Sequence, residues 1–297
     1  MIDALLQHIT RIPLNVRWLT HQSRLGLHKS QQHGSGLEFD QIMEYRHGEA
    51  IRKINWAATA RQGGDTPFVN VYYEEKDLTV MLLVDMSASM DFGSVRLTKK
   101  ALTAEIAASL VYSALAGHDR IGCLGFASAV VSYFPPQHSR MYQRAIPESL
   151  LTGGSAQAAA NFANAVDCLA RLVKRQALVF LLSDFLTDDL QGLEQALRRL
   201  CRLHEVIGLI VTDPLETSLP AGASRLMTRD LETGQLRSYR LTRRNQRRMA
   251  HHEHTRRAQL HQVFQRLGVS YMTVTPHSNY GADISHLLLT RHRRASA

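Results

Sequence analysis

From residue 78 onward, short apolar runs alternate with longer segments in which apolar residues recur at helical spacing. Two of the apolar runs, 78–85 and 177–184, are apolar at almost every position and end in an aspartate. Continuous apolar runs of this length are typical of strands that are buried on both faces of a sheet. We therefore predict that these two strands lie next to each other at the centre of the sheet.

The remaining pattern predicts further strands and helices in alternation. Strands are expected at 120–127, 129–134, 205–212 and 269–275, and helices at 97–115, 156–173, 190–203, 243–267 and 282–289. This alternation is typical of βαβ units, and it predicts an α/β fold with a doubly wound, mostly parallel sheet. At 225–241, two alternating runs flank Asp230-Leu231-Glu232-Thr233-Gly234, which predicts a β-hairpin inserted into this pattern.

The first 77 residues do not follow the alternation of strands and helices. They end after a loop containing Gly63 and Gly64, a composition that is typical of a boundary. We expect an N-terminal extension at 1–77 and an α/β domain at 78–297.

Composition places the chain among ordinary globular proteins, with 44% hydrophobic and 21% charged residues. We find no run of about 20 apolar residues and no pattern of a signal peptide, so we expect a cytoplasmic protein without a membrane span. Cys123, Cys168 and Cys201 form no CxxC pair. We interpret them as reduced residues within helices and strands.

The formal net charge of +9 is concentrated in one stretch of the chain. Residues 224–257 contain ten arginines against three acidic residues, a net charge of +7. Such a surface can attract nucleic acid, anionic lipid or an acidic protein. Tyr239 is the one aromatic residue among these charges, which is too few for a base-stacking surface. A solvated basic surface is therefore the favoured interpretation, and nucleic-acid binding through 225–257 stays an alternative.

Hydroxyl and carboxylate side chains follow the two central strands. Asp85, Ser87 and Ser89 come where the first strand ends, and Asp184 ends the second. A third loop contains two glycines followed by Ser155. Ligands of doubly wound sheets bind beyond the carboxyl ends of the strands, so these side chains are expected in one crevice. An all-oxygen set of this kind suits Mg²⁺ or another small divalent cation.

These three loops resemble the metal-ion-dependent adhesion site of von Willebrand factor A domains. The likeness rests on Asp85-x-Ser87-x-Ser89, on Gly-Gly-Ser155 and on Ser-Asp184. The resemblance implies that hydroxyls contact the metal directly, that carboxylates often act through water, and that an acidic residue of a protein partner fills the vacant position.

One position departs from the adhesion-site pattern. The family usually has threonine where this chain has Ser155, which lacks the methyl group that fixes the rotamer. We therefore expect the metal to bind weakly, or Thr152 to assist. A purely structural alternative is that Ser87 and Ser89 cap the following helix while Asp85 anchors the turn.

A second resemblance covers nearly the whole chain, roughly residues 34–290. The chain is similar to a bacterial family catalogued as a domain of unknown function, number fifty-eight, through Gly34-x-Gly36-x-Glu38-Phe39, Tyr45-x-x-Gly48, Arg52-x-Ile54-Asn55-Trp56, Ala60-Arg61 and Asp230-x-Glu232-Thr233-Gly234. Members couple such an N-terminal region to an A-type domain and often carry membrane helices. Because the family typically sits beside MoxR-type AAA+ ATPases, the resemblance implies an adaptor that binds such an ATPase.

The N-terminal signature contains a candidate patch for partner binding, formed by Arg46, Arg52, Trp56 and Arg61. The alternative is that these residues attach the N-terminal segment to the A-type domain.

An enzymatic alternative is a Mg²⁺-dependent phosphatase of the haloacid dehalogenase class, with Asp85 as nucleophile. In that class a second acid serves as proton donor two residues later, where this chain has Ser87. No lysine lies in the loop expected to neutralise phosphate. We therefore expect a non-catalytic protein that binds other proteins.

Overall fold

The computed structural model describes residues 9–10, 12, 14, 38–45, 51, 54–62, 66–73, 78–95, 97–153, 159–187, 189–217, 225–229, 236–240 and 242–295. The chain divides into two compact units, one of Asn15–Asp77 and one of Met1–Leu14 with Leu78–Ala297. The sequence-based division instead placed the whole of 1–77 in one extension. The start of the chain belongs to the second unit because the amide of Ile12 donates to Ser113 Oγ at 2.8 Å.

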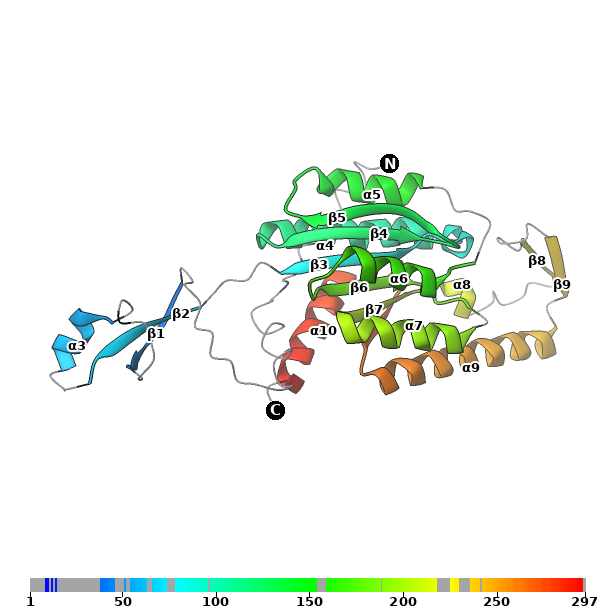
Figure 1. The fold of residues 1–297 in the computed structure, drawn as a ribbon. Helices are drawn as coiled ribbons and strands as arrows, with labels where there is room; N and C mark the ends of the chain where they lie inside the picture. Colours follow the sequence, from blue (N-terminus) through cyan, green and yellow to red (C-terminus); the bar gives the residue numbers. More distant parts are fainter. Residues whose placement is uncertain are drawn as a thin grey trace. The chain divides into compact units, whose positions relative to one another are not determined.

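The second unit contains a six-stranded sheet in the order β10-β7-β6-β3-β4-β5 (Figure 1). Its strands are β3 (Thr79–Asp85), β4 (Arg120–Phe126), β5 (Val130–Gln137), β6 (Leu178–Ser183), β7 (Glu205–Val211) and β10 (Ser270–Val274). All neighbours are parallel except β5, which runs antiparallel to β4. The prediction of a mostly parallel sheet with two adjacent acid-terminated strands at its centre is confirmed, since β3 pairs with β6.

Helices cover both faces of this sheet. On one face, α6 (Phe162–Leu172), α7 (Leu190–Leu203) and α9 (Arg243–Leu267) share a buried apolar cluster with β3, β4 and β6. On the other face lies α4 (Lys99–Ala116), which contacts α5 (Tyr142–Thr152) and α10 (Tyr280–Ala295). Nearly every side chain of α4 from Leu102 to Leu115 is buried, because the helix lies between the sheet and these two helices. Short helices η2 (Ala88–Asp91) and α8 (Pro214–Thr217) follow β3 and β7.

Two sequence expectations need correction. The helix expected at 156–173 is described only from Phe162 to Leu172, and Ala160 and Asn161 precede it without helical structure. The side chain of Asn161 accepts from the amide of Asn164 and so caps the helix there. Sequence analysis also missed α5, which contains Pro147 and has only a narrow apolar face around Ile146 and Leu150.

Two smaller sheets complete the described structure. In the Asn15–Asp77 unit, β1 (Glu38–Glu44) pairs antiparallel with β2 (Phe68–Tyr73), and α3 (Trp56–Gln62) lies between them in sequence. The expected hairpin is confirmed as the antiparallel pair β8 (Arg225–Arg229) and β9 (Leu236–Arg240). Among the described residues, none of the helices is sufficiently long and apolar to cross a membrane.

Candidate functional site

Three neighbouring parallel strands, β3, β6 and β7, end at the same edge of the sheet. Each is followed by or ends in an aspartate: Asp85, Asp184 and Asp213. All three are buried in spite of their charge. Because a buried carboxylate needs hydrogen bonds or a cation, the partners of these acids define the chemistry of the edge.

The first loop is organised around Asp85. Its Oδ1 accepts the amide of Ser87 at 2.9 Å, and its Oδ2 accepts the hydroxyl of Ser183 at 2.5 Å. The hydroxyls of Ser87 and Ser89 lie 3.1 Å apart. Ser87 precedes η2, but its side chain makes no capping hydrogen bond. The capping alternative therefore does not explain the Ser87 hydroxyl.

The third loop turns sharply after β6. Phe185 has a φ of +52°, which is uncommon for a residue with a side chain and is typical of strained functional turns. Its ring is buried and stacks on Phe162, which offsets part of that strain. The turn aims Asp184 back at the edge of the sheet, where its Oδ1 accepts the amide of Leu186 at 3.1 Å.

A lysine that sequence analysis did not identify binds Asp184. Lys99 is the first residue of α4, and its Nζ lies 2.6 Å from Asp184 Oδ2 and 2.5 Å from Glu216 Oε1. Burial alone lowers the pKa of Lys99, but the two carboxylates raise it above its ordinary value of 10.5, so the side chain is protonated at neutral pH. The expectation that no lysine lies in the loop that would neutralise phosphate is not contradicted, because Lys99 reaches the crevice from the first turn of helix α4.

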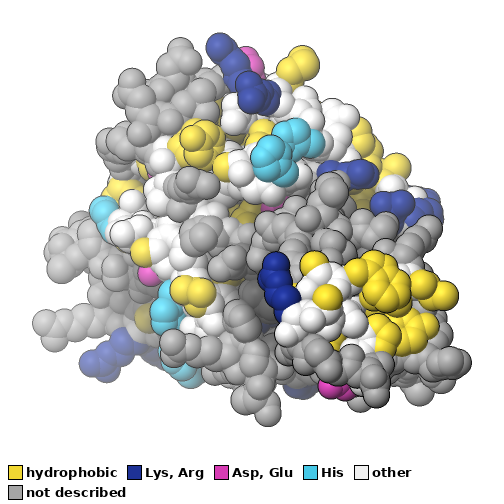
Figure 2. Space-filling model, turned by 90° about the vertical axis from the view of Figure 1, so that its left-hand side faces the viewer, with side chains coloured by type: hydrophobic (Ala, Val, Ile, Leu, Met, Phe, Trp, Pro, Cys, Tyr) yellow, Lys and Arg dark blue, Asp and Glu magenta, His cyan; other side chains and the backbone are white. Residues whose placement is uncertain are grey.

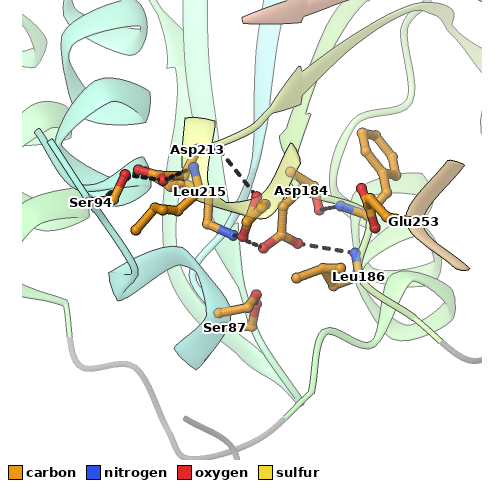
Figure 3. A network of polar contacts seen from close by, with 12 residues as sticks. Ser87, Ser94, Asp184, Leu186, Asp213, Leu215 and Glu253 are labelled. Atoms are coloured by element: carbon orange, nitrogen blue, oxygen red, sulfur yellow. Dashed lines mark hydrogen bonds and ion pairs between the residues drawn. The ribbon is translucent and has the colours of Figure 1, made fainter. Parts of the chain in front are cut away.

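The third carboxylate, Asp213, is satisfied by hydrogen bonds. It accepts from the amide and the hydroxyl of Ser94 and from the amide of Leu215. Burial raises the pKa of Asp213, but these hydrogen bonds and the charge of Lys99 lower it by more than burial raises it. The pKa of Asp213 therefore lies below its ordinary value. Figure 3 shows Ser94, Asp213 and Leu215 in one network beside Asp184, with Ser87 at its side.

The second loop approaches the first at its described end. The carbonyl of Gly153 accepts from Lys100 Nζ at 2.8 Å. A Cβ on Gly153 would lie 2.3 Å from Met86 Cε, the end of a flexible side chain, and 2.6 Å from the backbone carbonyl oxygen of Ser149. The close approach to the backbone of Ser149 therefore favours glycine here. Thr152 is exposed and donates its hydroxyl to the carbonyl of Glu148 in its own helix. Ser155, the expected ligand of this loop, lies outside the described residues.

Electrostatics single out Asp85 among the three aspartates. Burial and the neighbouring charge of Asp184 raise the pKa of Asp85 to about 6, against the lowering effect of its bonds to Ser183 and Ser87. A nearby cation would favour its ionised form. Asp85 therefore carries a charge that no described cation contacts, whereas Asp184 has Lys99.

The oxygen atoms at this edge of the sheet meet some of the requirements of a site for a small cation. Two ligands at adjacent corners of a Mg²⁺ octahedron, each about 2.1 Å from the ion, lie about 3 Å apart, and the hydroxyls of Ser87 and Ser89 lie 3.1 Å apart. Asp184 fits less well, because its Oδ2 already binds Lys99. Among the described residues, no group of three or more His, Cys, Asp or Glu side chains could hold a metal ion, so a cation at this edge depends on the hydroxyls.

The candidate patch of the N-terminal unit is described only in part. Trp56 is 66% exposed and Arg61 is also exposed, whereas Arg46 and Arg52 lie outside the described residues. Ile42 and Ile51 of this unit are exposed as well. Apolar side chains are visible on the face drawn in Figure 2. Exposed aromatic and apolar groups are typical of protein-binding surfaces.

The predicted basic helix has the expected bounds, Arg243–Leu267. Its second half is anchored in the core by Leu260, Val263 and Phe264. Its first half is exposed at several positions, namely Arg244, Arg247, Arg248, His251, His252 and His254. The one acid of α9, Glu253, pairs with Arg256 and Arg257.

The sheet order and the helices on both faces define a von Willebrand factor A-like fold, as the motif resemblance implied. More specifically, the chain belongs to the DUF58 family, described as protein of unknown function, whose model matches residues 41–261. Uncharacterized proteins of Mycobacterium bovis and Mycobacterium tuberculosis are 28% identical over 266 residues, which is 89% of this chain and 82% of theirs.

The chain is also similar to solved structures. The conserved hypothetical protein BatB from Bacteroides thetaiotaomicron has a TM-score of 0.50 at 17% identity, over 73% of this chain and 99% of that one. A von Willebrand factor type A protein from Catenulispora acidiphila matches 77% of this chain and 44% of that one, with 9% identity and a TM-score of 0.36.

Proposed function

We propose that the carboxyl edge of the sheet is a non-catalytic protein-binding site that uses a divalent cation such as Mg²⁺. The observation that supports it best is the pair of hydroxyls, Ser87 and Ser89, at octahedral spacing beyond the central strand. These two hydroxyls would hold the cation directly, Asp85 and Asp184 would do so through water, and Ser155 would complete the set. When bound, the cation supplies an electrophilic position for an acidic side chain of the partner.

The chain's own residues prepare this position. Asp85 fixes the first loop by accepting the amide of Ser87, and Ser183 fixes Asp85. Because these bonds lie within adjacent strands and their loops, the hydroxyls are oriented before any partner arrives. Such preorganisation reduces the entropy that binding costs.

An acidic protein partner is favoured by the charge around the edge. Arg256 donates from Nη1 to the carbonyl of Phe185 at 3.1 Å, which links the basic helix α9 to the third loop. In Figure 1 α8 lies beside α9, and the two helices are in contact. The exposed arginines of α9 would therefore attract acidic groups to the same side of the unit. By family resemblance, we propose a MoxR-type AAA+ ATPase as this partner.

A phosphatase function receives less support. Asp85 is only 2% exposed, and both of its oxygens accept hydrogen bonds, so it is poorly placed as a nucleophile. Lys99 reaches the crevice but is bound by two carboxylates, so its ammonium is not available to phosphate. The purified protein is expected to leave phosphate esters unchanged.

The test is interferometry with the full chain immobilised and a purified MoxR-type ATPase from the same organism in solution. Wild type in Mg²⁺ is compared with wild type in EDTA and with the Ser87→Ala/Ser89→Ala variant in Mg²⁺. We expect chelation and hydroxyl removal to weaken binding at least tenfold each. Ser139→Ala is the control, because Ser139 follows β5 at Gln137, which pairs with Ile121 at the opposite edge of the sheet.

Equal binding by all of these samples would rule out the edge as the binding site. A steep loss of nucleic-acid binding between 50 and 200 mM salt, without any effect of EDTA, would instead favour the basic stretch 225–257 as a nucleic-acid surface.

A further inference from the structure

Lys99 occupies a position that is unfavourable for a lysine. It is the first residue of α4, where the helix dipole is positive and repels cations. Its side chain is 1% exposed, so its ammonium has lost nearly all contact with water. A lysine is stable there only because something compensates its charge.

Two carboxylates provide the compensation, and they come from two different strand ends. Asp184 follows β6 and Glu216 lies in α8 after β7, with ammonium–oxygen distances of 2.6 and 2.5 Å. Asp184 is 2% exposed, whereas Glu216 is 22% exposed. Glu216 can therefore hold Lys99 near solvent if Asp184 releases it.

The same Asp184 belongs to the proposed cation site. Its Oδ2 binds Lys99 and its Oδ1 accepts the amide of Leu186, so neither oxygen is free of a partner in this structure. A divalent cation drawing on Asp184 would bring two positive charges close to the ammonium. The two cations repel each other, and both need the same carboxylate.

We propose that Lys99 competes with the divalent cation for Asp184 and thereby sets the affinity of the site. In the resting state Lys99 neutralises Asp184; when the site is filled, Lys99 is bound by Glu216 alone. A partner carboxylate that binds the cation also favours the filled state, since it adds negative charge beside the two cations. This inference rests on the proposed function, because the site is the one proposed there.

The experiment is calorimetric titration of the full chain with Mg²⁺ and with Mn²⁺. Lys99→Met removes the ammonium and keeps an unbranched side chain. We expect Lys99→Met to bind both ions at least tenfold more tightly than wild type. Lys174→Met is the matched control, because it changes net charge equally on an exposed lysine whose ammonium donates to the carbonyl of Ala170 in its own segment; its affinity should equal that of wild type.

A second variant moves the affinity the other way. Glu216→Gln removes the carboxylate that receives Lys99, so the ammonium is held more firmly by Asp184. We expect Glu216→Gln to bind the ions at least threefold more weakly than wild type. This variant keeps both members of the more buried ion pair, and it tests the inference even if Lys99→Met does not fold. Far-ultraviolet circular dichroism establishes that each titrated variant is folded.

The inference is overturned if folded Lys99→Met binds the ions no more tightly than wild type, or if Glu216→Gln binds them more tightly. These results are independent of partner capture. If Lys99→Met gains affinity while the ATPase binds equally in EDTA, the competition stands and the proposed function fails. If ATPase binding requires Mg²⁺ but Lys99→Met gains nothing, only the competition fails.

Discussion

The loops after β3 and β6 both begin with a buried aspartate on adjacent strands, yet the two carboxylates have opposite environments. Asp184 is neutralised by Lys99 at 2.6 Å. Among the described residues, Asp85 is bound by neutral donors, namely Ser183 and the amide and side chain of Ser87, and its pKa is raised to about 6. The comparison indicates that Asp184 supports the fold through its ion pair, whereas the charge of Asp85 costs stability, as expected of a carboxylate in the proposed cation site.

The largest expected effect is that of Asp184→Asn. This change leaves the buried Lys99 with Glu216 alone, and breaking a buried ion pair typically lowers the unfolding free energy by about 3 kcal/mol or more. Urea unfolding at pH 7.5 measures the loss. Asp167→Asn is the control, because Asp167 pairs with Arg199 on the surface; there the loss should stay below about 1 kcal/mol. Equal losses in both variants would contradict the stabilising role of the Asp184 pair.

Asp85→Asn is expected to raise the unfolding free energy, whereas Asp184→Asn lowers it. A pKa of about 6 means that ionised Asp85 lowers stability at neutral pH by at most about 3 kcal/mol. Asparagine removes that charge but matches Ser183 less well, so we expect a net rise of about 1 kcal/mol. The raised pKa makes the contribution of Asp85 favourable below pH 3.8, and it is lost as pH rises through about 6.

The measurement for Asp85→Asn is the difference in unfolding free energy between variant and wild type, recorded without divalent cations at pH 4.5 and 7.5. The difference should grow toward pH 7.5. A variant that is less stable than wild type at pH 7.5 would show that Asp85 stabilises the fold as Asp184 does.

A buried histidine titrates in a neighbouring pH range, and its contribution to stability changes with pH in the opposite direction to that of Asp85. His204, between α7 and β7, has no hydrogen-bond partner for either ring nitrogen among the described residues, and burial lowers its pKa. A lowered pKa gives stability that is complete above the ordinary value of 6.5 and is lost as pH falls below it. His204→Leu should therefore reduce the loss of stability between pH 6.5 and 5.

Parallel denaturant curves of wild type and His204→Leu at pH 5, 6 and 7 test this. If the unfolding free energy of the variant depends on pH as steeply as that of wild type, His204 does not contribute to the pH dependence of stability. The titration of Asp85, whose contribution to the unfolding free energy falls as pH rises, would then be the one assigned titration in this pH range.

Sequence patterns predicted the elements whose signals are local. The central strands, the hairpin and the bounds of α9 follow from apolar runs, alternation and charge within one segment. Asp85, Ser87 and Asp184 followed from acids and hydroxyls at strand ends. Asp213 could have been found by the same signal, because β7 is also a continuous apolar run followed by an acid.

Lys99 and Glu216 could not be predicted in this way. Lys99 is 85 residues before Asp184 in the chain, and Glu216 lies in a four-residue helix after β7. The two adjacent lysines at 99 and 100 predict a solvent-exposed helix N-terminus, since lysines are rarely buried. Only the packing of α4 against the sheet shows which of them turns inward.

The smallest expected effect on stability is that of Ser87→Ala/Ser89→Ala. The two hydroxyls bind each other, and the Ser87 hydroxyl also interacts with Asp85. Removing both partners of the Ser87–Ser89 bond leaves neither of them unsatisfied, and Asp85 keeps its bonds to Ser183 and the amide of Ser87, so the change should be within about 0.5 kcal/mol of wild type. Ser87→Ala alone should be no more stable than the double variant, because it leaves the Ser89 hydroxyl without that partner.

Differential scanning fluorimetry compares the three proteins with and without 10 mM Mg²⁺. We expect Mg²⁺ to raise the melting temperature of wild type only, since a ligand stabilises the folded state it binds. A double variant that melts far below wild type would mean that these hydroxyls serve the fold, and the contrast between the two loops would then be lost.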